Sequence, residues 1–280
     1  MHKKTTIIGA LLAAMLFTGA QPTVAAESVE IAKQPWSFSG VFGTFDKDQL
    51  QRGFQVFREV CASCHSARLL AFRNLSEKGG PEYSEEQVKA LAAEYEIIDA
   101  TAEGGVRPGI AADRWPSPFA NDQEARDANG GALPPDFSVI ANARGTTQPF
   151  PYWLLNYVTP YQEGGPDYIY ALLTGYEETP PHGAEIPEGK YYNHVFPGNA
   201  IGMAPPLADD SVTYGTGENG ETLAATLDQQ SRDVSAFLMW LSEPHMVARK
   251  ETGLQVILFL ILFAGLMYAV KQRLWAKIEH

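Results

Sequence analysis

The motif Cys61-Ala62-Ser63-Cys64-His65 constrains this chain more than any other feature of its sequence. Two cysteines separated by two residues and followed directly by a histidine form the attachment site of a c-type haem. Each thiol can add across one haem vinyl group, and the adjacent histidine is then held under the iron as its proximal ligand. The chain has only two cysteines, and the motif uses both of them. The sequence therefore predicts one covalently bound haem c.

Two other kinds of site also use a pair of cysteines at this spacing. A structural zinc site needs a second pair of Cys or His ligands at metal spacing, whereas His182, His194 and His245 stand singly. A thioredoxin-like redox pair needs a strand that leads into a helix, whereas an amphipathic stretch precedes this motif. Haem attachment explains the pattern better than either alternative.

The N-terminus has the pattern of a secretory signal peptide. It has a positive n-region at residues 2–4, an apolar run at residues 7–20 and a small-residue cleavage site at residues 24–26. We therefore expect residues 1–26 to be removed on export, so that the mature chain begins near Glu27. The alternative, an uncleaved anchor helix, is disfavoured because the apolar run is short. Exported cysteines usually form disulfides, but haem attachment would consume both cysteines here.

A second membrane segment is predicted near the C-terminus. Residues 253–270 carry no charge, and as a helix they would span about 27 Å, enough to cross the hydrocarbon layer of a bilayer. A buried core helix of this length would show a polar face, whereas this stretch has only Gln255. Together with the signal peptide, this predicts a single-pass protein of the bacterial inner membrane. Residues 27–248 would then form a periplasmic haem domain and residues 271–280 a cytoplasmic tail.

The segment predicted to be exported is strongly acidic. Residues 27–248 contain 31 of the 33 Asp and Glu residues but only 14 of the 21 Lys and Arg residues, a formal balance of −17. A surface of this sign repels nucleic acid, so a nucleic-acid-binding function is disfavoured. It would attract a basic protein partner and raise the rate of encounter, although acidic side chains also serve plain solubility.

Hydrophobic periodicity predicts two helices that pack on each other next to the haem motif. Residues 46–65 have apolar side chains at helical spacing and lead into the motif, and Gly53 would let another helix approach closely. The partner is expected at residues 228–243, which also have one apolar face and are followed by Pro244.

The rest of the exported segment is predicted to hold two further helices and long loops. We expect helices at residues 84–95 and 166–173. Residues 101–151 are rich in Gly, Pro, Asn and Asp, and a loop this long in a compact domain usually wraps around something, for which a haem edge is the obvious candidate. The segment from Thr146 to Gly165 is aromatic and proline-rich. We expect it to be a loop or an irregular segment packed on the domain, and predict nothing more specific for it.

A haem that carries electrons without binding small ligands needs a second axial residue besides the histidine. The mature methionines outside the predicted anchor are Met203, Met239 and Met246, and only the first of these lies in a loop. Gly202 would let that loop bend, and the two prolines at positions 205 and 206 would stiffen it. Met203 is therefore the first candidate, with His182 and His194 as alternatives.

With these residues in view, the chain resembles the cytochrome c1 family, whose members are the haem subunits of the cytochrome bc1 complex. The haem motif is shared by many cytochromes, but the Leu-Pro-Pro-Asp and Gly-Met-Ala-Pro-Pro segments together with a tail anchor are far more specific. The segments that carry the resemblance are Arg52-Gly53-Phe54-Gln55-Val56, Cys61 to His65, Arg107-Pro108-Gly109, Gly131-Ala132-Leu133-Pro134-Pro135-Asp136, Tyr168 to Tyr176, Phe196-Pro197-Gly198, Ala200 to Pro206, Asp233 to Trp240 and Ser242-Glu243-Pro244.

The resemblance implies a fold and a set of site residues. The fold would be mainly α, a class I cytochrome c-like haem domain with long loops and insertions, plus a single C-terminal transmembrane helix. Cys61 and Cys64 would be the thioether attachments, with His65 and Met203 as the axial ligands of the iron. Arg144 would lie near a haem propionate. Tyr168 and Pro135 would line the haem pocket.

The resemblance also implies a function. An electron would arrive from the Rieske iron-sulfur subunit, reside on the haem and leave to a soluble or membrane-tethered cytochrome c. The chain would have no enzymatic activity alone and would act in a membrane complex with cytochrome b, a complex expected to be dimeric. One rival function is that of another membrane-anchored monohaem cytochrome c feeding a terminal oxidase or peroxidase. A second rival is an exported thiol oxidoreductase.

Overall fold

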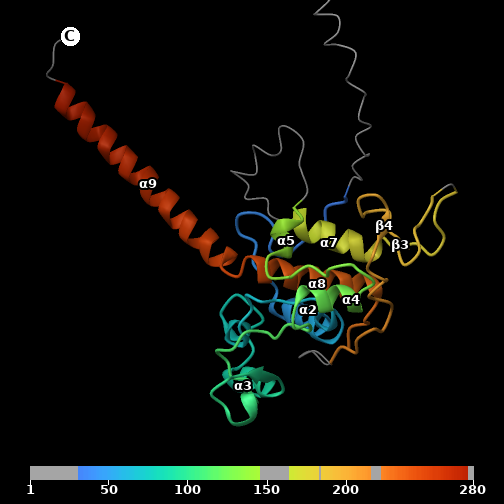
Figure 1. The fold of residues 1–280 in the computed structure, drawn as a ribbon. Coiled ribbons are helices and arrows are strands. Elements are labelled where there is room, and N and C mark those ends of the chain that lie inside the picture. The colour runs from blue at the N-terminus through green and yellow to red at the C-terminus, as the bar shows by residue number, and fades with distance from the viewer. Residues whose placement is uncertain (1–30, 146–163, 183, 216–221, 277–280) are drawn as a thin grey trace, which may run out of the picture. The chain divides into compact units, whose positions relative to one another are not determined.

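The computed structural model describes residues 31–145, 164–182, 184–215 and 222–276 of the chain (Figure 1). The described part is mainly helical, as predicted, with two small two-stranded antiparallel sheets. The signal-peptide prediction and most of the Thr146–Gly165 segment lie outside the described residues. In chain order the elements are α2 (Lys47–Glu59), η1 (Cys61–Ser63), η2 (Phe72–Ser76), α3 (Glu85–Ala93), β1 (Glu96–Ile98), η3 (Glu103–Gly105), β2 (Val106–Pro108), α4 (Asp122–Ala128), α5 (Ile140–Ala143), α7 (Gly164–Thr174), β3 (Tyr191–Tyr192), β4 (Ala200–Ile201), α8 (Leu227–Ser242) and α9 (Met246–Trp275).

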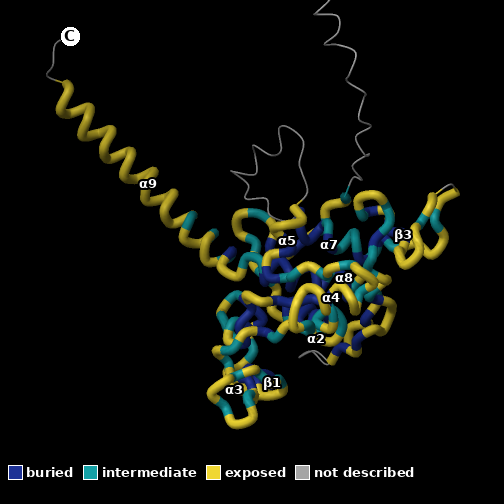
Figure 2. Tube along the Cα trace, viewed as in Figure 1, coloured by how far each residue is buried: buried dark blue, intermediate teal, exposed yellow. Residues whose placement is uncertain are grey.

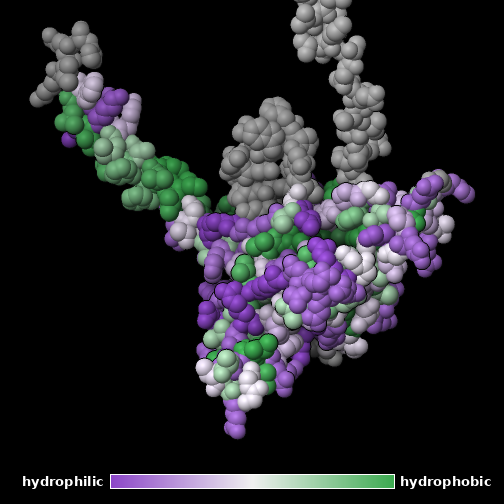
Figure 3. All heavy atoms as spheres, viewed as in Figure 1, coloured by the Kyte–Doolittle hydropathy of each residue, from purple (hydrophilic) through white to green (hydrophobic). Residues whose placement is uncertain are grey.

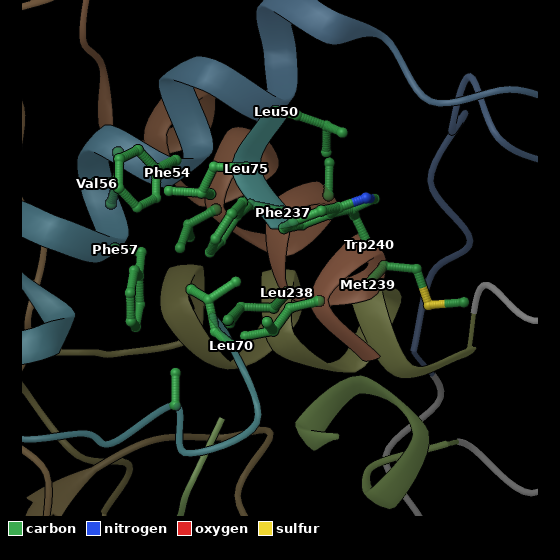
Figure 4. Close-up of a cluster of buried hydrophobic side chains, with 14 of the residues drawn as sticks. Leu50, Phe54, Val56, Phe57, Leu70, Leu75, Phe237, Leu238, Met239 and Trp240 are labelled. Atoms are coloured by element: carbon green, nitrogen blue, oxygen red, sulfur yellow. The ribbon is translucent and has the colours of Figure 1, made fainter. Parts of the chain in front are cut away.

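The two helices predicted to pack beside the haem motif form the centre of the core. Helix α2 begins after Asp46, whose side chain accepts a hydrogen bond from the Gln49 N–H at 2.8 Å. Helix α8 is capped in the same way by Thr226. Their apolar faces meet in one cluster, which Figure 4 shows in close-up and Figure 2 shows as the dark blue interior. The large aromatic side chains of this cluster that come from α2 and α8 are Phe54, Phe57, Phe237 and Trp240.

Helices α2 and α8 approach closely at Gly53, as the sequence predicted. A Cβ atom at Gly53 would lie 2.1 Å from the backbone oxygen of Asp233 and 2.7 Å from the Cβ of Phe237. Just before this glycine, Arg52 binds Asp233 with two hydrogen bonds, from Nε to Oδ2 at 2.9 Å and from Nη2 to Oδ1 at 3.2 Å. The Asp233 side chain is fully buried. A backbone contact and an ion pair therefore fix the same point of the helix crossing.

Replacing Gly53 with alanine should destabilise the domain. The added methyl group meets backbone atoms, which cannot swing aside, so the two helices must separate. Overpacking of this kind costs about 1–3 kcal/mol of the free energy of unfolding. Chemical denaturation of the haem-loaded chain in detergent, followed by circular dichroism, would measure the loss. Gly215→Ala is the matched control, because a Cβ there meets nothing within 4 Å. Equal stability of the two variants would contradict the close approach.

Three sequence predictions about secondary structure need correction or refinement. The first helix ends at Glu59 rather than running through to His65, because Val60 caps it, with its N–H still bonded to the Val56 carbonyl, and the motif continues as the tighter turn η1. Residues 101–145 are not one loop, since they contain η3, β2, α4 and α5. The helix predicted at residues 166–173 begins two residues earlier, at Gly164.

The C-terminal helix α9 runs from Met246 to Trp275 and contains the whole predicted span of residues 253–270. It is long and apolar enough to cross a membrane, and none of its most apolar 18-residue window is buried against the rest of the chain. Figure 3 shows apolar side chains along the middle of this helix. Met246 at its start is fully buried. The N-terminal end of α9, which we call its foot, is therefore packed on the domain, whereas the predicted span is exposed.

Candidate haem-binding site

The two cysteines and the histidine of the motif lie on one tight turn after α2. The N–H groups of Cys64 and His65 both donate to the carbonyl oxygen of Cys61, at 3.1 and 2.9 Å. The Ser63 hydroxyl donates to the carbonyl of Val60 at 2.7 Å and closes the turn from outside. Both cysteines are partly buried and neither forms a disulfide. The turn therefore presents two thiols and one imidazole from the same short stretch of backbone.

The protonation of the first thiol argues against the thiol oxidoreductase function. Burial, aided by the charge of Cys64, raises the pKa of the Cys61 thiol to about 12. A redox-active cysteine needs the opposite, a lowered pKa that yields thiolate at neutral pH. Within the described ranges, the structure shows no group of three or more His, Cys, Asp or Glu side chains that could hold a metal ion.

His65 is held by backbone and aromatic contacts from a segment 70 residues further along the chain. Its Nδ1 lies 2.8 Å from the carbonyl oxygen of Pro135, and its ring stacks on that of Phe137 at 4.0 Å between centroids. Burial lowers the pKa of His65, an effect that the Pro135 hydrogen bond opposes only in part. Because a carbonyl can only accept, the proton of the neutral ring sits on Nδ1. Nε2 is then left with the lone pair that a metal ligand requires.

Asp136 fastens the Pro135 segment to the residues that follow the haem motif. One of its oxygens, Oδ2, accepts hydrogen bonds from the Ser66 hydroxyl at 2.8 Å and the Arg68 N–H at 3.0 Å. The other, Oδ1, accepts from the Ser138 N–H at 2.8 Å. Burial alone would raise the pKa of Asp136, but these hydrogen bonds outweigh it and lower the pKa below its usual value. A charged carboxylate thus holds the two chain segments around His65 together.

Replacing Asp136 with asparagine should destabilise the domain at neutral pH and have little effect in acid. The folded protein lowers the pKa of this carboxyl, so the stabilisation is present above the unfolded value of about 3.9 and is lost as the pH falls through the folded pKa. Thermal melts of the haem-loaded wild type and Asp136→Asn at a series of pH values would show the two curves converging below about pH 4. A constant difference across the series would contradict this role.

Met203 lies in a loop that the structure joins to the same Pro135 segment. The β3–β4 pair, with Tyr191 opposite Ile201, leads directly into this loop. A Cβ on Gly202 would lie 3.2 Å from the Cβ of Ala132, so the loop packs on the chain just before Pro135. The hydroxyl of Tyr176 donates to the carbonyl oxygen of Met203 at 3.1 Å. The loop is therefore held from two sides.

Two further predicted residues, Tyr168 and Arg144, affect the electrostatics of this region. Burial raises the pKa of Tyr176, with a further contribution from Tyr168 on α7. Burial also raises the pKa of Tyr168, an effect that the positive charge of Arg144 opposes. Arg144 itself ends α5 and is exposed. Tyr176 is thus bound to Met203 by a hydrogen bond, whereas Tyr168 affects Tyr176, and Arg144 affects Tyr168, through electrostatics.

The alternative sixth ligands are placed differently from Met203. His182 and His194 are both exposed, and the Nδ1 of His194 pairs with Glu177 at 3.0 Å. Met239 and Met246 are fully buried in the core. The partly buried Met203 remains the candidate that the structure favours, and its role as a ligand remains a prediction, as do the roles of Arg144, Tyr168 and Pro135.

Three residues around the site were not predicted as site residues. Phe137 stacks on His65, Asp136 joins the two segments and Tyr176 binds the Met203 loop. Asp136 and Tyr176 were partly indicated, because both lie in segments that carry the resemblance to cytochrome c1. Nothing in the residues alone indicated which partner each would contact.

The sequence model of the family described as Cytochrome C1 family matches residues 36–278, most of the chain. The chain belongs to the cytochrome c1 family. A relative named Cytochrome c1 from Rhodospirillum rubrum is 43% identical over 297 residues, covering 99% of this chain and 100% of the relative. Another Cytochrome c1, from Blastochloris viridis, is 45% identical over 250 residues, covering 88% of this chain and 86% of the relative.

A third cytochrome c1 relative is longer than this chain. The protein named Cytochrome b/c1 from Bradyrhizobium diazoefficiens is 54% identical over 244 residues, which cover 86% of this chain but only 35% of that relative. This chain therefore spans about a third of the relative with which it shares the highest of these three identities.

The residues of the motif fit the haem c of the cytochrome c1 family. Two thiols lie on one turn, and the neighbouring imidazole has its Nδ1 proton engaged and its Nε2 available. Cys61 and Cys64 would hold the porphyrin through thioethers, and His65 would hold the iron. Met203 is placed on a loop that packs against the segment that holds His65.

Proposed function

We propose that this chain is the electron-transfer subunit of a quinol:cytochrome c oxidoreductase, the bc1 complex. The observation that carries the proposal is the family match over residues 36–278 together with the geometry of the Cys61–His65 turn. In this function an electron arrives from a Rieske iron-sulfur subunit and leaves to a soluble or membrane-tethered cytochrome c. No substrate bond is made or broken by this chain, so it is not an enzyme by itself.

The chain's own residues would set the conditions for electron transfer. Haem c supplies the one-electron redox chemistry when bound. Pro135 and Phe137 fix the tautomer and the plane of the His65 ring, and Asp136 keeps that segment in place. Tyr176 holds the backbone of Met203, which would keep its thioether in a fixed place as the second proposed ligand of the iron. Such rigid ligation keeps the cost of reorganisation low when the electron arrives or leaves.

The proposed partners are cytochrome b and the Rieske iron-sulfur subunit, in a dimeric membrane complex. The name and length of the Bradyrhizobium relative support cytochrome b as a partner, because that name joins the two cytochromes in one protein. The bare α9 helix supports assembly in a membrane. The acidic balance of residues 27–248 supports a basic cytochrome c as the acceptor, since opposite charges raise the rate of encounter.

The proposed location is the bacterial inner membrane, with the haem domain in the periplasm and the C-terminus in the cytoplasm. The charge pattern of residues 1–26 supports export of the domain. The chain is anchored in the membrane by α9, whose most apolar 18-residue window is not buried against the described part of the chain.

Purification of the haem-loaded chain from its native membranes in mild detergent tests the proposal. Optical spectra should show cytochrome b in fixed stoichiometry with the c-type haem, two b haems for each c haem, and the pool should reduce added cytochrome c with a quinol. A pure c-type spectrum without b haems would favour the rival, a membrane-anchored cytochrome that feeds an oxidase or peroxidase.

A further inference from the structure

A short apolar loop lies at the foot of the C-terminal helix and is not used by the haem site. We call residues 36–45 the foot loop. Its base is buried, with Trp36 and Phe38 6% and 1% exposed and their rings stacked at 5.4 Å. Its tip is open, with Val41 and Phe42 40% and 80% exposed. Two adjacent apolar side chains thus project from a firmly packed base.

The backbone of the foot loop is closed and tight. The Ser39 N–H donates to the Trp36 carbonyl at 3.1 Å, and the Thr44 N–H donates to the Ser37 carbonyl at 3.2 Å. A Cβ on Gly43 would lie 2.1 Å from the backbone oxygen of Ser39, so only glycine fits this turn. The exposure of the tip therefore follows from a defined loop geometry.

Lys250 ties this loop to α9 at the level where the membrane span begins. Its Nζ donates to the carbonyl oxygens of Phe38 at 2.6 Å and Gly43 at 3.4 Å. Lys250 precedes the first residue of the uncharged stretch, Gly253, by three positions, which is about 4.5 Å along the helix axis. The polar layer of a bilayer is roughly 5–8 Å thick on each side. In Figure 1 the blue loop before α2 lies beside the start of α9.

The composition of the foot loop favours a contact with lipid. Residues 36–45 contain no Asp, Glu, Lys or Arg, although the segment 27–248 has a formal balance of −17. Single exposed apolar side chains are ordinary on protein surfaces, but here two adjacent ones stand on an uncharged loop bound to the foot of a membrane anchor. Apolar side chains held at this depth are the ones that enter the headgroup and acyl boundary.

We propose that Val41 and Phe42 insert into the interfacial layer of the bilayer, as a second lipid contact beside α9. Lys250 sets the depth of the loop by binding both sides of its backbone. The domain is then held to the membrane at two points, which restricts its tilt about the anchor. This inference depends on the membrane anchoring by α9, so the test has to measure that anchoring separately.

Site-specific labelling can test the insertion, because haem attachment leaves no other thiol in the chain. Phe42→Cys, Ile98→Cys and Leu262→Cys would each be labelled with the fluorophore NBD in the haem-loaded full chain and reconstituted into phosphatidylcholine vesicles. Ile98 is 89% exposed on the β1–β2 hairpin and serves as the aqueous control, and Leu262 is 75% exposed within α9 and serves as the lipid control. For each labelled sample, the fluorescence intensity with a quencher is divided by the intensity without it. This ratio is measured once with nitroxide-bearing lipid and once with aqueous iodide, and the two are compared.

The expected result is lipid quenching at position 42 at least about twofold above that at position 98, with iodide quenching in the reverse order. Iodide quenching at position 42 equal to that at position 98 would overturn the proposal. Protection from both quenchers would also overturn it, because it would mean a protein contact. Absence of lipid quenching at Leu262→Cys would show that the anchoring itself has failed.

The role of Lys250 has its own variants in the Phe42→Cys background. Lys250→Met keeps the aliphatic stem but removes the donors, so lipid quenching at position 42 should fall, whereas Lys250→Arg should retain it. Unchanged lipid quenching at position 42 in Lys250→Met would show that Lys250 does not hold the foot loop in place.

Discussion

Replacing Met203 with leucine is expected to leave the haem covalently attached but to lower its midpoint potential. The thioether that favours the reduced iron is lost, while Cys61, Cys64 and His65 are untouched. The fall should be on the order of 0.1 V or more, since axial ligands set haem potentials over roughly 0.8 V. Redox titration followed by the haem absorbance measures the potential, and denaturing electrophoresis with a haem stain confirms the covalent attachment.

Tyr176→Phe is the matched control for this substitution. It keeps the thioether and removes only the hydroxyl that donates to the Met203 carbonyl, so the potential should shift far less than in Met203→Leu. A Met203→Leu protein with the wild-type potential would assign the sixth ligand to another residue. The exposed His182 and His194 would then be tested in the same way.

Replacing Arg52 with methionine is expected to destabilise the domain severely. The fully buried Asp233 carboxylate would lose two hydrogen bonds and its counter-charge, keeping the bond from Gln229 Nε2 at 2.9 Å. Removal of one partner of a buried ion pair costs about 3–5 kcal/mol of the free energy of unfolding. Denaturant titration of the haem-loaded chain measures the change.

Arg58→Met on the same helix provides the comparison. Arg58 pairs with Glu94, and both side chains are substantially exposed, so its loss should cost no more than about 1 kcal/mol. Adding Asp233→Asn to Arg52→Met should recover part of the stability, because it removes the unpaired buried charge. If Arg52→Met and Arg58→Met were equally stable, the ion pair at the helix crossing would not be a main support of the fold.

The helices that form the core could be predicted because their patterns are local. The cap residues Asp46, Ser84 and Thr226 stand next to amphipathic stretches, and each of the three helices begins directly after its cap. The hairpin of β1 and β2 could not be predicted from a local pattern, because its three-residue strands are too short to show an alternation of apolar and polar residues. Helix α4 has a cap, Asn121, that the sequence does display. Its seven residues are mostly charged or small, so it has no apolar face to mark it.

The haem motif could also be predicted, because its chemistry lies within five consecutive residues. The residues that surround the motif could not be predicted, because the contacts of His65 with Pro135 and Phe137 join positions about 70 residues apart. The early end of α2 at Glu59 also escaped prediction. Residues 46–65 keep an apolar pattern throughout, and the tight turn that groups Cys61, Cys64 and His65 is a requirement of the haem geometry rather than of periodicity.

The contact between His65 and the Pro135 segment bears on the order of events during biogenesis. The haem motif emerges during synthesis well before residues 135–138, and the folded domain covers the His65 ring with this later segment. In a partly synthesised chain that lacks residues 135–138, the His65 ring has neither of these two contacts. The bonds of Asp136 to Ser66 and Arg68 also need this later segment, so the full set of contacts around His65 can form only after residues 135–138 have been made.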